Sequence, residues 1–256
     1  MANYSKFSRG QKHLGGIAVL IAVFVIFYYV FFHKGHNHST NENVFLEERH
    51  NFISWDNHVQ GIFYRVIVPE NFKLTVIFLH GEAFSSEIWH NLGTLDILAK
   101  RGFRVFAIDL PAHGKSNSIK KPKTLKERGE FLERLLEKLH ALPGVLVVPS
   151  MSGTFALPYI MKHKDTLKTR LRGFVPVAPV ATDKYSVKSF GDLNVETLIT
   201  YGELDTDLGH VSLERLKQIP GSTMNMIKDA PHACYVKKPE VFHQTLLEFL
   251  HRILET

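Results

Sequence analysis

A chain of 256 residues, 45% of them hydrophobic, can build one large core but is short for two full-sized domains. Residues 1–34 hold four Lys or Arg and no acidic residue, so residues 35–256 carry 27 basic and 25 acidic residues. This near balance of charge excludes the clustered basic face of a nucleic-acid-binding domain. The single cysteine, Cys234, excludes an internal disulfide and a zinc site built on cysteines.

Residues 14–32 form an uninterrupted apolar run without a charge or a proline. Its nineteen residues match the length that a helix needs to cross the hydrocarbon layer of a bilayer. A cleaved signal peptide would have a shorter apolar core followed by small residues, whereas Phe, Phe, His and Lys stand at 31–34. We therefore predict a transmembrane anchor at 14–32, preceded by a short basic tail at 1–13 and followed by a polar stalk at 33–44.

The orientation of this anchor is read from the basic residues on either side of it. Lys6, Arg9 and Lys12 precede the apolar run, whereas Lys34 and Arg49 are the only Lys or Arg in a comparable stretch after it. Cytoplasmic flanks carry the excess of Lys and Arg. The bias favours a single-pass type II arrangement with the large domain lumenal or extracellular, and a cytoplasmic-facing domain is the alternative.

Residues 45–256 alternate short apolar strands with amphipathic helices and predict one α/β domain. The predicted strands cover 61–68, 74–80, 103–109, 145–149, 173–177, 196–201 and 223–228, and the main helices cover 124–142, 153–164, 211–219 and 239–254. Strand, helix and strand in sequence indicate parallel pairing through right-handed crossovers, so we expect a mostly parallel, doubly wound sheet with helices on both faces. Functional residues of such sheets gather at the carboxyl ends of the strands.

Residues 145–157, VLVVPSMSGTFAL, pass from a buried strand into a helix through one sharp turn, which we place at Ser152. A serine on such a strained turn projects clear of the sheet, and the amide of the next residue, Gly153, faces a developing oxyanion. The usual pattern is G-x-S-x-G, and here Ser150 and Thr154 replace both outer glycines. Taken alone, the motif also fits a serine that only caps a helix.

Two polar turns follow two of the predicted strands. The first is HGEAFSS at 80–86. It stands where an enzyme with such a serine turn supplies its second oxyanion amide, and here we expect that amide to be the one of Glu82. The second, DLPAHGKS at 109–116, resembles the D-x-P-G-H-G-x-S turn of the α/β-hydrolase superfamily, with alanine in place of the first glycine. We interpret Asp109 and His113 as residues that brace this turn and do not contact the substrate.

The remaining members of a catalytic triad are expected at the ends of later strands. YGELD at 201–205 matches the family's G-x-x-D ending and indicates Asp205 as the acid, with Asp207 and then Glu203 as alternatives. His232 lies in the loop before the last helix and is the expected base. The chain order Ser, Asp, His is the one that this fold uses, so we predict a triad of Ser152, Asp205 and His232.

Beyond the superfamily, the chain resembles the type-fourteen group of α/β-hydrolase domain-containing proteins, including its membrane-anchored branch. The resemblance rests on the anchor, HGEAFSSEIW at 80–89, DLPAHGKS at 109–116, the PSMSG elbow at 149–153 and the short segment 178–193. Many lipases and esterases insert a long helical lid at that last position, so about fifteen residues predict a minimal lid and an open pocket for small acyl groups.

The leading functional hypothesis is hydrolysis of small acyl esters, thioesters or amides through an acyl-enzyme, with no metal and no organic cofactor. The resemblance implies a second one, transfer of the acyl group to a thiol acceptor such as coenzyme A, because the soluble member of the group is linked to that reaction. A third is a non-catalytic, membrane-tethered binding module, which the irregular elbow favours. The sequence leaves the oligomeric state open.

Overall fold

The computed structural model describes residues 46–56 and 61–256, all of them within the compact unit Val44–Thr256. The predicted basic tail, transmembrane anchor and polar stalk lie outside the described residues, and the start of the domain at residue 45 stays a prediction. Among the helices that are described, none combines the length and the apolar character needed to span a membrane.

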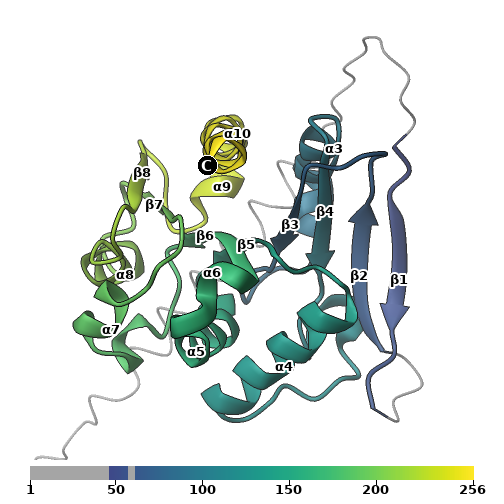
Figure 1. The fold of residues 1–256 in the computed structure, drawn as a ribbon, viewed down its shortest axis with the longest axis horizontal. Coiled ribbons are helices and arrows are strands. Elements are labelled where there is room, and N and C mark those ends of the chain that lie inside the picture. Colours follow the sequence, from purple (N-terminus) through teal and green to yellow (C-terminus); the bar gives the residue numbers. More distant parts are fainter. Residues whose placement is uncertain (1–45, 57–60) are drawn as a thin grey trace, which may run out of the picture. The chain divides into compact units, whose positions relative to one another are not determined.

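The described residues form an eight-stranded sheet with the order β1-β2-β4-β3-β5-β6-β7-β8 (Figure 1). Its strands are β1 (Arg49–Ile53), β2 (Ile62–Ile67), β3 (Leu74–Phe78), β4 (Phe103–Ile108), β5 (Gly144–Pro149), β6 (Leu171–Val177), β7 (Leu198–Gly202) and β8 (Thr223–Ile227). β2 pairs antiparallel with β1 and β4, and the strands from β4 through β8 pair in parallel. The mostly parallel sheet is therefore confirmed.

The edge strand β1 is an element that the sequence did not predict. Its residues, RHNFI, lack alternating polarity, and four of its five side chains are exposed. The central strands behave differently: every residue of β3 and of β5 is buried. Strands covered on both faces read as continuous apolar runs, which explains why they were predictable and β1 was not.

Helices cover both faces of the sheet (Figure 1). The α-helices are α2 (Glu87–Asn91), α3 (Thr94–Ala99), α4 (Leu125–Lys138), α5 (Gly153–Lys162), α6 (Leu167–Arg170), α7 (Val187–Gly191), α8 (Leu208–Leu216), α9 (Cys234–Lys237) and α10 (Pro239–Glu255), and the short 3-10 turns are η1 (Gly114–Ser116), η2 (Ser150–Ser152), η3 (Lys164–Thr166) and η4 (Thr182–Lys184). α4 packs closely on α5, while α10 contacts α3 and β8. Between β6 and β7 the chain holds only η4 and α7, in place of a long lid.

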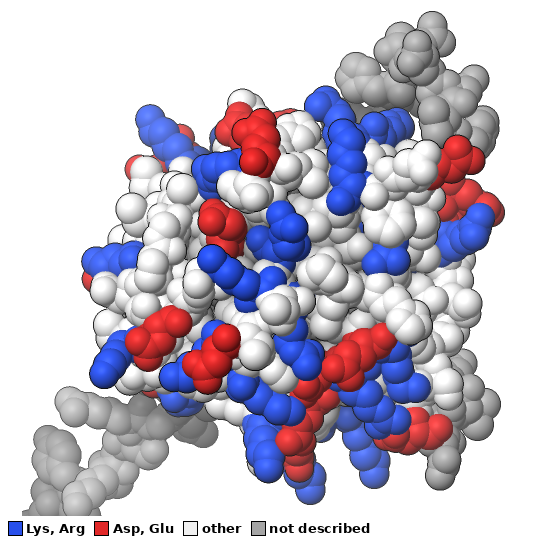
Figure 2. Space-filling view, viewed as in Figure 1, with Lys and Arg blue, Asp and Glu red and all other residues white. Residues whose placement is uncertain are grey.

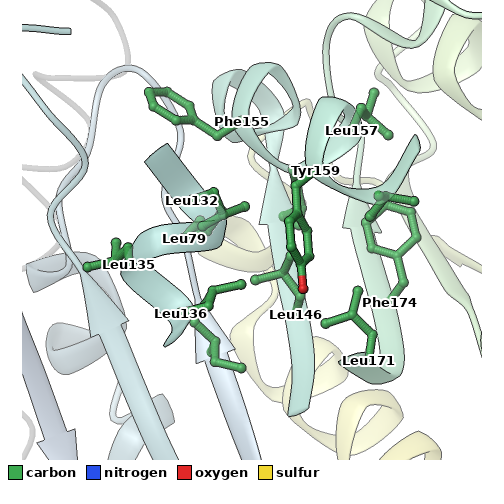
Figure 3. Packing of buried hydrophobic residues seen from close by; sticks show 14 of the residues in the cluster. Leu79, Leu132, Leu135, Leu136, Leu146, Phe155, Leu157, Tyr159, Leu171 and Phe174 are labelled. Atoms are coloured by element: carbon green, nitrogen blue, oxygen red, sulfur yellow. The ribbon is translucent and has the colours of Figure 1, made fainter. Parts of the chain in front are cut away.

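Glycine permits the close approach of α4 and α5. A Cβ atom at Gly129 would lie 3.0 Å from backbone and side-chain atoms of Pro158. Figure 3 shows the leucines of α4 facing the aromatic side chains of α5 above the sheet, with Leu132, Leu135 and Leu136 at the three- and four-residue spacing of one helix face. This core anchors α5, and α5 begins at the turn that carries the candidate site.

The charged surface is mixed. On the face seen in Figure 2, basic and acidic side chains are interspersed and no large area carries a single sign. Ion pairs account for part of this pattern, as where Glu133 of α4 lies 2.6 Å from Lys162 of α5. Positive and negative charges are therefore nearly balanced on this face, as they are over the domain as a whole.

Candidate active site

Three side chains at the carboxyl ends of three parallel strands meet in one hydrogen-bonded chain. His232, in the loop after β8, has its Nδ1 2.5 Å from Oδ2 of Asp205, which follows β7. The other ring nitrogen of His232, Nε2, lies 2.8 Å from Oγ of Ser150, directly after β5. Asp205 is 7% exposed, so its carboxylate reaches the imidazole from within the protein. Asp205 and His232 therefore lie together as predicted, but the serine beside them is Ser150.

Ser150 occupies the sharp turn of the elbow, which we define as residues 149–153. Its φ angle is +47°, a left-handed conformation that is uncommon for a residue with a side chain. The chain turns here from β5 into η2 and then α5. The amide of Val180 donates a hydrogen bond of 3.0 Å to the carbonyl oxygen of Ser150 and so fixes the turn against the loop after β6. Strain held in this way at a strand-to-helix turn is typical of a reactive site.

The prediction that Ser152 occupies this turn is wrong. Ser152 is fully buried, and its Oγ donates a 2.7 Å hydrogen bond to the carbonyl oxygen of Pro149. The sequence did hold a usable signal, because the strand was correctly predicted to end at Pro149 and an elbow serine is the first residue beyond its strand. Counted in this way, Val148 and Ser152 occupy the two glycine positions of G-x-S-x-G.

The prediction for Gly153 is wrong for a related reason. The amides at the Gly153 cap of η2 donate to the carbonyl oxygens of Ser150 and Met151, so they are used inside the helix. A Cβ atom at Gly153 would lie 2.4 Å from the carbonyl oxygen of Val180, which makes close packing the reason for this glycine. The amide that follows Ser150 is that of Met151, in the first turn of η2, where amides have no partner within the helix.

Glu82, predicted as the second oxyanion donor, lies in the turn after β3, next to Gly81. It belongs to the oxyanion turn, which we define as residues 80–84 and which is closed by a 3.1 Å hydrogen bond from the Phe84 amide to the Gly81 carbonyl oxygen. A Cβ atom at Gly81 would lie 3.6 Å from Cβ of Ser150. Within the described part of the chain, the Glu82 amide has no hydrogen-bond acceptor.

The side chain of His80 supports the oxyanion turn through hydrogen bonds. It is fully buried, and burial lowers its pKa to about 4, so its ring is neutral near pH 7. Nε2 accepts a 3.0 Å hydrogen bond from the Leu110 amide, which leaves the hydrogen on Nδ1, 2.9 Å from the Gly81 carbonyl oxygen. His80 therefore joins the turn after β3 to the turn after β4.

Asp109 performs the bracing role that the sequence predicted. One carboxylate oxygen accepts from the Ser86 amide at 2.6 Å and the other from the Lys115 amide at 2.7 Å. His113 is also placed as a brace, with Nδ1 3.0 Å from the Pro111 carbonyl oxygen. Both carboxylate oxygens of Asp109 are thus committed to backbone amides, one in the segment after β3 and one in the segment after β4.

The alternative acids lie elsewhere. Asp207 is exposed at the N-terminal cap of α8, and Oε2 of Glu203 accepts from the Asp229 amide at 2.9 Å. The one cysteine, Cys234, is buried, and burial raises its thiol pKa to about 12, so it is no competing nucleophile. Over residues 46–56 and 61–256, no group of three or more His, Cys, Asp or Glu side chains is arranged to hold a metal ion.

Sequence comparisons agree with this architecture. A family model for the alpha/beta hydrolase fold matches residues 75–184. The chain is 45% identical over 194 residues to the Protein ABHD14A of Mus musculus, covering 75% of this chain and 77% of that one. It is 40% identical over 195 residues to the Putative protein-lysine deacylase ABHD14B of Homo sapiens, covering 75% and 90%.

Solved structures share the fold. A CIB-like hydrolase from Thermoplasma acidophilum superimposes with a TM-score of 0.71 at 23% identity, over 80% of this chain and 99% of the other. The carboxylesterase CesB from Bacillus subtilis gives a TM-score of 0.65 at 17% identity, over 80% and 92%. The strand order and the hydrogen-bonded chain of Ser150, His232 and Asp205 agree with the sequence identity to both ABHD14 branches. This protein therefore belongs to the ABHD14 group of the α/β-hydrolase fold family.

Proposed function

We propose that this protein is a serine hydrolase that cleaves small acyl esters, thioesters or amides, with Ser150 as its nucleophile. The observation that carries the proposal is the 2.8 Å distance between Ser150 Oγ and His232 Nε2, with Asp205 on the far side of the ring. A serine hydroxyl is a weak nucleophile until an adjacent base takes its proton, and this geometry supplies the base.

The steps follow from the atoms in contact. His232 Nε2 takes the proton of Ser150 Oγ as the oxygen attacks the acyl carbon, and Asp205 keeps the other ring hydrogen on Nδ1 and stabilises the imidazolium. The imidazolium then gives its proton to the leaving alcohol, thiol or amine, which departs and leaves an ester on Ser150. A water molecule, deprotonated by His232, cleaves that ester and restores the free serine.

The amides of Met151 and Glu82 are the donors that we assign to the oxyanion. Both lie next to the elbow serine, one in the first turn of η2 and one in the oxyanion turn. Donors already in place cost no reorganisation during the reaction, and each contributes about 3–4 kcal/mol in comparable sites. Glu82 keeps its predicted role in this proposal, and Met151 replaces Gly153.

The class of substrate rests on the short connection between β6 and β7 and on the relatives. Only η4 and α7 stand where a long lid would cover the site, which suits a small acyl group on a larger carrier. ABHD14B is named as a putative protein-lysine deacylase, and an acyl amide belongs to the proposed range. The same acyl-enzyme would pass its acyl group to a thiol such as coenzyme A where one competes with water.

A fluorophosphonate probe, which phosphonylates an activated serine with loss of fluoride, tests the nucleophile. We expect labelling of the natural protein and of Ser152→Ala, and none of Ser150→Ala. Ser152 is the matched control because it lies two residues away in the same elbow but bonds to Pro149 and not to His232. Labelling that survives Ser150→Ala, or that depends on Ser152, would contradict the assignment. A folded natural protein that takes no label would favour the non-catalytic binding module.

A second measurement separates hydrolysis from acyl transfer. The natural protein, free of the probe, is incubated with an acyl ester in the presence and absence of coenzyme A, and free acid and acyl thioester are quantified. Formation of thioester in step with the loss of free acid would identify transfer, and unchanged free acid would identify hydrolysis. Ser150→Ala is expected to abolish both products.

We also propose that residues 14–32 anchor the protein in a membrane as a single-pass type II segment, with the catalytic domain lumenal or extracellular. The nineteen apolar residues and the basic residues before them support this proposal. Resistance to alkaline carbonate extraction tests the anchor, and protease protection in sealed vesicles tests the orientation. A domain that is digested from the cytoplasmic side would reverse the orientation.

A further inference from the structure

The carboxylate of Glu82 is held by the side chains of Lys121 and His113, both in the segment after β4. Its Oε2 lies 3.1 Å from Nζ of Lys121, and its Oε1 lies 3.4 Å from Nε2 of His113. The side chains of Lys121 and His113 are 27% and 11% exposed, against 60% for Glu82 itself. Burial alone would raise the pKa of the Glu82 carboxyl, but hydrogen bonding and charge from Lys121 and His113 hold it below its ordinary value.

This contact is the outer attachment of the oxyanion turn. On the inner side, His80 bonds to the Gly81 carbonyl oxygen within the turn, and Asp109 bonds to the amide of Ser86, two residues beyond it, so the chain is fixed on both sides of Glu82. Between them, the Glu82 peptide is fixed by the turn's own hydrogen bond and by its side chain. The direction in which the Glu82 amide points is therefore coupled to its carboxylate.

The geometry points to Lys121 and His113 as positioning residues: by holding the Glu82 carboxylate they aim the Glu82 amide at the oxygen of the acyl group. This inference rests on the function proposed above. An amide that serves the transition state more than the bound substrate affects kcat more than KM. Loosening it is therefore expected to slow acyl-enzyme formation while substrate binding stays nearly unchanged.

The test measures kcat and KM for a small acyl ester, 4-nitrophenyl acetate, in Lys121→Met, Lys121→Arg and Lys120→Met. Lys120 is exposed and is the neighbouring control. We expect Lys121→Met to lower kcat about tenfold at pH 8 with KM within twofold, a loss smaller than that for removing an oxyanion donor outright. Lys121→Arg is expected to restore kcat.

A second variant, Glu82→Gln, guards against a folding defect at Lys121, since it removes the charge from the other side of the contact. It should lower kcat and not KM, as Lys121→Met does. If both variants match Lys120→Met in kcat and KM, or if KM rises while kcat is unchanged, the inference is wrong. Failure of the proposed function looks different, because the natural protein would then show neither turnover nor fluorophosphonate labelling.

Discussion

The elbow and the oxyanion turn lie side by side but are held by different means. The elbow is fixed by its backbone: Ser150 has a left-handed conformation, the Val180 amide donates a hydrogen bond to the Ser150 carbonyl oxygen, and Gly153 packs against the loop after β6. The oxyanion turn is fixed by side chains, with His80 and Asp109 on its inner side and a partly exposed carboxylate on its outer side. Changes in the elbow should therefore disturb folding and reaction together, whereas changes in the outer oxyanion turn should disturb the reaction alone.

The largest expected effect lies outside both regions, at the group that orients the base. Asp205→Asn keeps the size of the side chain but removes the charge that holds the hydrogen on His232 Nδ1. We expect kcat to fall about 10⁴-fold with little change in the thermal unfolding midpoint. Asp207→Asn is the matched control, because Asp207 is exposed two residues away. Equal losses in the two variants would exclude Asp205 as the acid of the triad.

Gly153→Ala should break the backbone-based support of the elbow. The added Cβ atom would stand 2.4 Å from the Val180 carbonyl oxygen, so the loop after β6 must move. We expect a loss of about 1–3 kcal/mol in the free energy of unfolding, measured with urea, together with reduced labelling by a fluorophosphonate. Gly191→Ala is the control, since the nearest atom to its Cβ position is 3.8 Å away. Unchanged stability in Gly153→Ala would show that the elbow tolerates side chains.

The acid sensitivity of the fold sharpens the comparison, because one buried histidine braces the oxyanion turn and another lies in the core. Burial lowers the pKa of His80 and of His243 to about 4, from an ordinary value of 6.5. The folded state therefore binds fewer protons than the unfolded one between these values, so stability is complete above pH 6.5 and falls as the pH falls toward 4. Each histidine contributes a slope of up to about 1.4 kcal/mol per pH unit.

His243→Gln is expected to remove one of these slopes. His243 Nε2 lies 2.8 Å from Thr94 Oγ1 between α10 and α3, and glutamine can keep a hydrogen bond there without titrating. The check is the free energy of urea unfolding at several pH values from 7.5 to 4.5, with the exposed His251→Gln as the control. A pH dependence identical in the two variants would show that burial of His243 is not part of the acid response.

Most of the fold was predictable because its central strands are buried on both faces and its helices carry clear apolar stripes. Asp205 was predictable from the G-x-x-D pattern that follows its strand, and His232 from its place in the loop before the last helix. The position of the serine was harder to predict, because the glycines that usually mark the elbow are replaced by Val148 and Ser152, and the end of the strand at Pro149 was left as the signal for Ser150. The glycine that remains near the turn, Gly153, favours an elbow at Ser152 in the sequence, but its role is packing.

The double contact of Val180 with the elbow has a consequence for engineering. Its amide donates a hydrogen bond to the Ser150 carbonyl oxygen, and its own carbonyl oxygen faces Gly153. The first residues after β6 therefore pack against the reactive turn and support it. A helical insertion meant to narrow substrate range would have to enter farther along the connection, near the exposed Val187. Grafts placed there would add a cover while leaving the register of the reactive turn untouched.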